Sequence, residues 1–187
     1  MKLIIVRHGD IGTVKNTFTG KTDKLLTENG KEEAKKLAQE LSKFKIDKIY
    51  SSPYIRAVQT AEEISKIVKR NVIITNALKE VDFGIFDGLT SEEALEKYPN
   101  LFENRLKDKW NYKILDGESY SGASARVINF INSIVSETED NIILVTHATL
   151  IKIIMVSILN KKLEDVEKDY IKTASYRIIE FKDGKFN

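Results

Sequence analysis

The stretch Lys2-Leu3-Ile4-Ile5-Val6-Arg7-His8-Gly9 decides the fold, because its apolar run ends abruptly in an arginine, an imidazole and a glycine. A second stretch, Ile142-Ile143-Leu144-Val145-Thr146-His147, likewise places a histidine two residues after an apolar run, near the other end of the chain. Apolar runs without alternation are typical of strands buried on both faces of a parallel sheet. We therefore expect two central strands, over residues 2–6 and 142–146, each followed by a histidine.

We expect further strands over residues 46–51 and 72–75. The apolar and polar residues of 175–181 alternate, which predicts another strand that ends at the hairpin signal Asp183-Gly184. Helices are expected between the strands. Thr27 is a plausible N-cap. Apolar residues recur at helical spacing in three segments. The three sets are Ala34, Leu37, Ala38 and Leu41; Ala57, Ala61, Ile64 and Val68; and Val127, Phe130, Ile131, Ile134 and Val135.

This alternation predicts an α/β fold with a mostly parallel sheet covered by helices, in one domain over residues 1–187. Neither Pro53 nor Pro99 marks a domain boundary. Residues 83–122 carry four glycines, the single Trp110 and no strong period. We expect that stretch to be an irregular excursion over one edge of the sheet.

Composition narrows the class of protein. The 187 residues are 42% hydrophobic and 31% charged, with a formal net charge of +2, so no nucleic-acid or membrane partner is expected. The chain has no cysteine, which excludes cysteine nucleophiles, disulfides and zinc–thiolate sites. The first apolar run has only four residues, too few for a signal peptide. We therefore expect a cytoplasmic protein.

Histidine occurs only twice, as His8 and His147. Each is expected just past the carboxyl end of a buried strand, which is the edge where open parallel sheets bind ligands. One such histidine would more often be incidental, but two at equivalent positions favour a functional pair. Neither has a second ligand at metal-binding spacing, so no metal site is expected.

Two arginines, Arg7 and Arg56, lie in segments where an anion could bind. Arg7 precedes His8 and opposes its protonation, which suits a nucleophile, although a surface ion pair is the alternative. Gly9 lets the chain turn sharply. Arg56 lies at the start of a helix, where free N–H groups favour anions and a cation is misplaced. That position favours a role in ligand binding.

Taken together, the ordered motifs resemble the histidine phosphatase superfamily, which includes the phosphoglycerate mutases and related phosphatases. The motifs are Arg7-His8-Gly9, Leu26-Thr27-Glu28-Asn29-Gly30, Ser51-Ser52-Pro53 with Arg56-Ala57 and Gln59-Thr60-Ala61, Gly117-Glu118-Ser119, and Thr146-His147. The resemblance implies a three-layer fold like that of phosphoglycerate mutases and a phosphohistidine intermediate without a cofactor or metal.

By this resemblance His8 is the nucleophile, His147 holds a phosphoryl oxygen, and Arg7 and Arg56 bind the phosphate. Thr19 and Gly20 fit the family's small-residue contact to the phosphate. Asn16 is a weaker match, because the segment before it has no tryptophan and is one residue short.

The proton donor to the leaving group has two candidates. Glu80 looks like the family's acid, since a carboxylate four residues before a glycine matches the relatives that this sequence resembles. Asp82 is its rival, and a solvated loop carboxylate is the alternative for either. The acid must be protonated when it acts, so its pKa should be raised by burial.

Departures from the mutase pattern favour the phosphatase branch. Ser91 replaces a substrate-gripping lysine, Arg105 stands without the arginine pair of mutases, and Ala148-Thr149 replaces Gly-Asn. Fewer groups remain to hold a second anionic centre, which a mutase needs. The stretch that includes Trp110 is more like the short bacterial phosphatases, including the α-ribazole phosphatase group.

We therefore expect a phosphoric monoester hydrolase of the histidine acid type that acts on small phosphorylated metabolites. An α-ribazole phosphatase of cobalamin synthesis, a cofactor-dependent phosphoglycerate mutase and a non-catalytic phospho-ligand-binding module are the alternatives. The sequence leaves open the substrate and whether the chain forms a homodimer.

Overall fold

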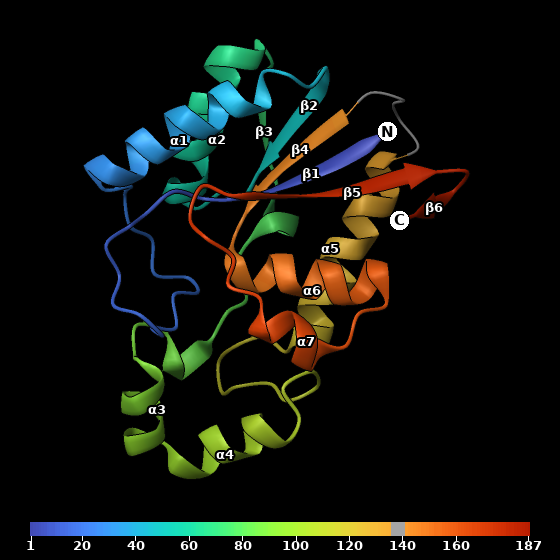
Figure 1. Cartoon of the computed structure of the whole chain (residues 1–187). Coiled ribbons are helices and arrows are strands. Elements are labelled where there is room, and N and C mark those ends of the chain that lie inside the picture. Colours follow the sequence, from blue (N-terminus) through green and yellow to red (C-terminus); the bar gives the residue numbers. More distant parts are fainter. Residues whose placement is uncertain (136–140) are drawn as a thin grey trace.

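A twisted mixed sheet forms the centre of the molecule in the computed structural model, which describes residues 1–135 and 141–187 (Figure 1). Its strand order is β3-β2-β4-β1-β5-β6. The strands are β1 (Lys2–Arg7), β2 (Ile46–Ser51), β3 (Val72–Ile74), β4 (Asn141–Thr146), β5 (Tyr176–Lys182) and β6 (Lys185–Phe186). The first four are parallel and the last two antiparallel. This confirms the mostly parallel α/β sheet.

The two apolar runs are adjacent central strands. β1 pairs with β4 in a register that sets Leu3 opposite Ile142 and Arg7 opposite Thr146. Leu3–Val6 and Ile142–Val145 are fully buried, as expected for strands covered on both faces. Because the register matches residue for residue, the residues that follow the two strands emerge side by side.

Helices cover both faces of the sheet, giving three layers (Figure 1). Ile4, Val6, Ile143 and Val145 pack in one cluster with α1 (Glu28–Leu41) and α2 (Ile55–Val68). The alternate residues Leu3, Ile5, Ile142 and Leu144 pack with α5 (Tyr120–Val135) and α6 (Ala148–Leu159). The strand period of two therefore divides each run between two cores.

Local signals set several element ends. Thr27 is the N-cap of α1, as predicted, and its hydroxyl accepts a hydrogen bond from the Gly30 N–H at 3.0 Å. The predicted hairpin connects β5 to β6, with positive φ at both Asp183 and Gly184. Both backbone angles match the tight hairpin turns that such a pair favours.

The stretch 83–122 is more regular than the sequence analysis predicted. It contains the 3₁₀ turn η2 (Gly84–Phe86) and two helices, α3 (Ser91–Lys97) and α4 (Pro99–Lys107). Both helices are too short to show a clear hydrophobic period. Their ends carry the signals instead, because Thr90 and Glu93 form a capping box and Pro99 begins α4. They form the lower end of the molecule in Figure 1.

The remaining elements are the 3₁₀ turn η1 (Asn76–Leu78) and the short helix α7 (Leu163–Lys168). Within residues 1–135 and 141–187, none of the helices has the length and apolar character needed to cross a membrane. The same residues contain no cluster of three or more His, Cys, Asp or Glu side chains arranged to hold a metal ion.

Candidate active site

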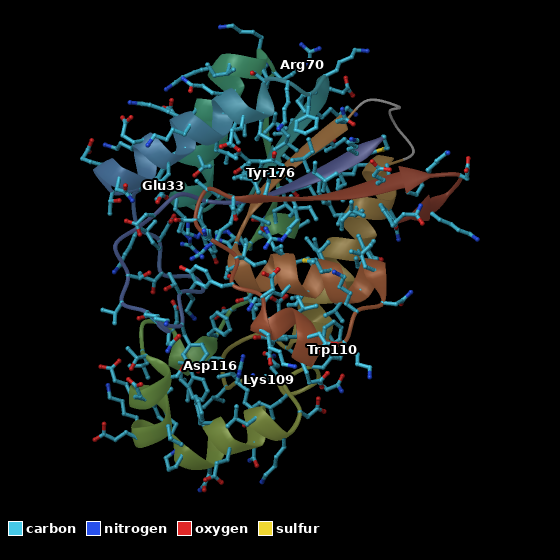
Figure 2. The ribbon with its side chains drawn as sticks, in the orientation of Figure 1. Glu33, Arg70, Lys109, Trp110, Asp116 and Tyr176 are labelled. Carbon is cyan, nitrogen blue, oxygen red and sulfur yellow. The ribbon has the colours of Figure 1, made fainter. Side chains whose placement is uncertain are left out.

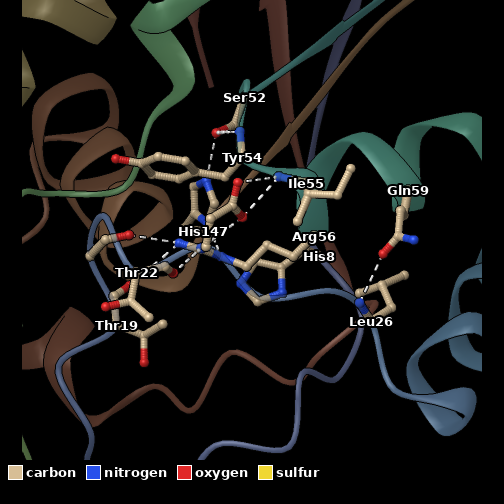
Figure 3. Close-up of polar contacts among 12 residues, drawn as sticks. His8, Thr19, Thr22, Leu26, Ser52, Tyr54, Ile55, Arg56, Gln59 and His147 are labelled. Atoms are coloured by element: carbon tan, nitrogen blue, oxygen red, sulfur yellow. Dashed lines mark hydrogen bonds and ion pairs between the residues drawn. The ribbon is translucent and has the colours of Figure 1, made fainter. Parts of the chain in front are cut away.

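His8 and His147 lie against each other at the carboxyl ends of β1 and β4 (Figure 3). Their ring centroids are 5.1 Å apart and the rings are inclined by 60°. Both side chains are buried. The predicted pairing of the two histidines at one sheet edge is therefore what the fold produces.

The His8 ring is held by its own backbone. Its Nδ1 lies 2.7 Å from the Gly9 carbonyl oxygen. A carbonyl can only accept, so Nδ1 carries the proton and Nε2 keeps its lone pair. Burial, then the positive charge of Arg56, and finally that of Arg7 lower the pKa of His8 to about 3. The ring is consequently neutral at physiological pH.

The His147 ring is held by two other side chains. Arg56 Nε donates to its Nδ1 at 3.2 Å, and its Nε2 lies 2.8 Å from Ser52 Oγ. Because Nδ1 accepts, the proton is on Nε2 and is donated to Ser52. Burial and the Arg56 charge hold the pKa of His147 well below its usual value. Tyr54 packs edge-on against the ring, 5.5 Å away between centroids.

Arg56 is fully buried at the centre of the site. Besides His147, it donates to the carbonyls of Thr22 and Gly20 at 2.8 Å each, and to that of Thr19 at 3.5 Å. Its Nη1 also lies 3.6 Å from the Asp23 carboxylate. The guanidinium therefore fixes the 19–23 loop and the orientation of His147, in addition to placing positive charge beside His8.

The 19–23 loop is fastened from two other sides. The Asp87 carboxylate accepts hydrogen bonds from the backbone N–H groups of Gly20 and Thr22 and from the Thr22 hydroxyl. Asp23 accepts the Ile55 N–H at 2.9 Å. The first N–H of α2, which was expected to be free for an anion, is thus taken by a carboxylate of the chain itself.

Arg7 is the last residue of β1 and directly precedes His8. Its Nη1 donates to the Ile171 carbonyl. Its Nε is a buried donor without a hydrogen-bond partner in the described part of the chain. An unpaired buried guanidinium donor is costly unless a ligand accepts from it. This donor and the charge of Arg7 favour anion binding next to His8.

The Glu80 side chain contacts the first turn of α6, the helix that begins directly after His147. Its carboxylate accepts the N–H groups of Thr149 and Leu150 at 3.0 Å and of Val81 at 2.9 Å. Burial raises the pKa of Glu80, against the opposing effects of those hydrogen bonds and of Arg56. A buried carboxyl with a raised pKa, held by the two N–H groups that follow Ala148, fits a proton donor.

Asp82 occupies a different environment. Its carboxylate accepts the Gly84 N–H at 2.8 Å and pairs with Lys21 at 3.5 Å, and its side chain is 37% exposed. Those contacts shape the turn before η2 and leave the carboxylate toward solvent. The geometry therefore favours Glu80 over Asp82 as the acid.

The turn after His8 is packed against α1 through two glycines. A methyl group on Gly9 would lie 2.5 Å from the Gly30 carbonyl oxygen, and one on Gly30 would lie 2.1 Å from the Asp10 carbonyl oxygen. Gly9 N–H also donates to Thr60 of α2 at 3.1 Å. The close approach of these backbones fixes the position of His8 and explains the glycine in both motifs.

The structure brings together most of the residues that the sequence singled out. His8, His147, Arg7, Arg56 and Glu80 gather at one end of the sheet, and Thr19 and Gly20 contact Arg56 through their carbonyls. Asn16 does not join them, because it is an exposed residue with positive φ whose carbonyl accepts from Ser91.

Sequence reasoning missed several residues that shape the site, namely Ser52, Tyr54, Thr22, Asp23 and Asp87. Ser52 and Tyr54 lie inside the quoted segment after β2, so their closeness to Arg56 was a usable signal. The contact between Asp87 and Thr22 spans 65 residues, and no local pattern indicates it.

Comparisons with known proteins show what this chain is similar to. The family model described as histidine phosphatase superfamily (branch 1) matches residues 3–187. Phosphoserine phosphatase 1 of Hydrogenobacter thermophilus is 31% identical over 99% of this chain and 89% of its own length.

Two solved structures with related sequences share the fold. Bacillus stearothermophilus YhfR has a TM-score of 0.89 at 27% identity, with 100% of this chain and 94% of that one covered. The phosphoserine phosphatase of Entamoeba histolytica, solved in complex with 3-phosphoglyceric acid, has a TM-score of 0.86 at 26% identity and coverages of 100% and 93%.

Proposed function

The chain belongs to the histidine phosphatase superfamily (branch 1), and from this premise we propose that it hydrolyses small phosphate monoesters through a phosphohistidine on His8. The coarser statement, a phosphatase of this superfamily, follows from the family match and from the phosphoserine phosphatase relative. The proposal adds the roles of individual residues.

One observation carries the proposal, namely the state of the His8 ring. A nucleophilic imidazole must be neutral and must present an unprotonated nitrogen to phosphorus. The Nδ1–H donates a hydrogen bond to the Gly9 carbonyl, so the Nε2 lone pair is the one that attacks. Burial and two arginines keep the ring neutral far below pH 7.

The positive charge needed during transfer comes from the protein. Negative charge spreads over three phosphoryl oxygens in the transition state, so preset cations and donors accelerate the reaction. Arg7 offers the unpaired Nε–H, and Arg56 contributes its buried charge. His147 supplies a further donor when its Nε2–H exchanges Ser52 Oγ for a phosphoryl oxygen.

Proton transfer is assigned to Glu80. In the first step the His8 Nε2–P bond forms while the P–O bond to the alcohol breaks, and the Glu80 carboxyl gives its proton to the departing oxygen. In the second step water attacks phosphorus, the Glu80 carboxylate takes a proton from it, and the N–P bond breaks. Inorganic phosphate leaves and both residues return to their starting states.

The departures from the mutase pattern support hydrolysis over isomerisation. A mutase must retain and turn a bisphosphate intermediate. Ser91, which stands where mutases carry a substrate-gripping lysine, is the first residue of α3, and its hydroxyl donates to the Asn16 carbonyl at 3.4 Å. Arg105 is buried beside Tyr120 and donates to its hydroxyl at 2.7 Å, so it serves the core.

The direct test is turnover of p-nitrophenyl phosphate with a chelator present, together with trapping of the phosphoenzyme. We expect wild-type turnover and an acid-labile phosphate on His8. His8→Ala should lose both, whereas His147→Ala should remain phosphorylatable, since its nucleophile is intact. Undiminished turnover by His8→Ala would refute the mechanism.

Substrate assays then distinguish the related activities. The panel pairs phosphoserine and 3-phosphoglycerate with α-ribazole 5′-phosphate, and an isomerisation assay with bisphosphoglycerate tests for mutase activity. We expect a negligible mutase rate. A mutase rate that matches the hydrolysis rate would instead make this chain a phosphoglycerate mutase.

A further inference from the structure

A pocket of about 260 Å³ is lined in part by Ala148 and Thr149, which follow His147 directly in the chain. Its lining comes from the loop after α4, the start of α5, one side of α6 and α7, and consists of Lys109, Tyr120, Ala148, Thr149, Lys152, Leu163 and Glu167. Figure 2 shows Lys109 next to Trp110, below α7. The mechanism described above uses none of the charged residues of this pocket.

The pocket carries an excess of positive charge. Lys109 Nζ lies 2.9 Å from both carboxylate oxygens of Glu167, so these two charges offset each other. Lys152 Nζ donates to the Glu167 backbone carbonyl at 3.0 Å, which is a neutral acceptor. Two ammonium groups and one carboxylate leave one positive charge, and that charge belongs to Lys152.

Lys152 retains donors for a ligand. An ammonium has three N–H groups, and one of them is accounted for by the Glu167 carbonyl. Burial, together with the nearby charges of Lys109 and Arg7, lowers the pKa of Lys152, while Glu167 and Asp169 oppose this. Arg7, which belongs to the proposed phosphate site, is thus among the charges that act on Lys152.

One lining residue of the pocket also contacts the proposed proton donor. Ala148 and Thr149 line it directly after His147, and the Thr149 N–H donates to Glu80. Lys152 follows Ala148 by four residues, a rise of about 6 Å along α6. A small molecule with its phosphate at His8 could therefore place a second group at Lys152.

We propose that this pocket holds a carboxylate of the substrate against Lys152, so that the enzyme prefers phosphate esters of hydroxy acids over esters that lack a carboxylate. The inference rests on the proposed phosphatase function. The single excess charge matches one carboxylate. Tyr120 can add a hydrogen bond, because its hydroxyl accepts from Arg105 and keeps its own proton to donate.

This assignment qualifies an expectation from the sequence, which found few groups to hold a second anionic centre. Lys109, Lys152 and Glu167 lie outside the motifs that resemble the family. Glu167 belongs to α7 and Lys109 to the loop before α5, so the fold brings together residues 58 positions apart.

The test compares two substrates with the same carbon chain, 3-phosphoglycerate and glycerol 3-phosphate, which differ in the carboxylate. We expect wild-type kcat/KM to favour 3-phosphoglycerate by about tenfold or more, as one charged hydrogen bond would give. Lys152→Met should lower that ratio about tenfold. Lys168→Met, which removes an exposed lysine paired with Asp165 on α7, should leave the ratio unchanged.

A variant with the opposite expected sign separates recognition from folding. Glu167→Gln removes the negative charge that faces Lys109 but keeps the backbone carbonyl that holds Lys152. We expect it to raise the preference for 3-phosphoglycerate by a few fold. Damage to the fold would not improve recognition of the carboxylate, so a raised ratio supports the proposal.

A wild-type ratio near one, or equal ratios in wild type, Lys152→Met and Glu167→Gln, would overturn the carboxylate assignment. Failure of the phosphatase mechanism would appear separately, as loss of p-nitrophenyl phosphate turnover in the wild type. In that event calorimetric binding of 3-phosphoglycerate and glycerol 3-phosphate to the wild type and Lys152→Met still tests the pocket. Tighter wild-type binding of 3-phosphoglycerate that Lys152→Met weakens supports it, and equal binding refutes it.

Discussion

His8 and His147 occupy the same place on neighbouring strands, yet their hydrogen bonds differ. The His8 ring donates to the carbonyl of the next residue and keeps Nε2 as a lone pair. The His147 ring is engaged at both nitrogens, by Arg56 and by Ser52. The sheet therefore sets where each imidazole lies, while the surrounding donors and acceptors decide whether a ring nitrogen keeps a lone pair free for attack on phosphorus.

Replacing each histidine by asparagine in turn tests whether the two rings have different roles. His8→Asn removes the nucleophile, and we expect kcat/KM to fall by about 10⁴-fold or more. His147→Asn removes one donor, for which a loss of about 10²–10³-fold is expected. The measurement is p-nitrophenyl phosphate turnover. Equal losses in both variants would contradict the different roles.

Neither histidine is assigned the proton that the leaving group needs, and replacement of Glu80 tests whether this carboxyl supplies it. Glu80→Gln should lower kcat/KM for an alkyl phosphate by about 10²–10⁴-fold, and by less for p-nitrophenyl phosphate, whose leaving group needs no acid. In the wild type, kcat/KM for the alkyl ester should fall as pH rises through the raised pKa of Glu80, because only the protonated carboxyl donates. Asp82→Asn is the matched control, and a loss as large as that of Glu80→Gln would move the role to Asp82.

Arg56 connects the two histidines, since its charge acts on His8 and its Nε holds His147. Arg56→Ala should raise the barrier by roughly 3 kcal/mol, about 10²-fold in kcat/KM. Arg56→Lys should restore little, because an ammonium cannot replace a planar fork that serves several acceptors. A change under tenfold in Arg56→Ala would contradict this role.

The smallest expected effect is on stability. The pKa of His8 is about 3 in the folded protein and about 6.5 when unfolded. The unfolded chain therefore binds more protons between these values, and stability falls as pH decreases from 6.5 toward 3. Between pH 7 and pH 5 the free energy of unfolding should fall by ~2 kcal/mol more in the wild type than in His8→Gln, which cannot titrate at this position. We expect the Tm of the wild type to fall by about 4–8 °C more than that of the variant over the same pH range. Identical Tm changes would show that His8 titrates normally.

The strands and the histidine pair were predictable because their signals are local. Leu3–Val6 and Ile142–Val145 are apolar throughout, and a parallel sheet places the residues after them at one edge. Glu80 was found through its spacing to Gly84 in the family resemblance. Its raised pKa follows from burial against α6, which no spacing reports.

The rest depends on contacts between distant residues. Asp87 reaches Thr22 and Lys109 reaches Glu167 only after folding. The helices α3 and α4 have too few residues for a hydrophobic period to emerge, although Thr90 and Pro99 mark their starts. Local signals therefore predicted the two histidines at one sheet edge, while the contacts of Asp87 and Lys109 required the folded structure.

The contact between Gly9 and Gly30 bears on how the protein opens. Since the two backbones touch with no room for a methyl group, the turn that carries His8 cannot move away unless the first turn of α1 moves with it. In native-state hydrogen exchange we expect the amides of residues 9–12 and 30–34 to become exposed together, as one cooperative unit. The proposed nucleophile would then be displaced in the same event that detaches α1, and a partly opened form that keeps His8 in place would not be populated.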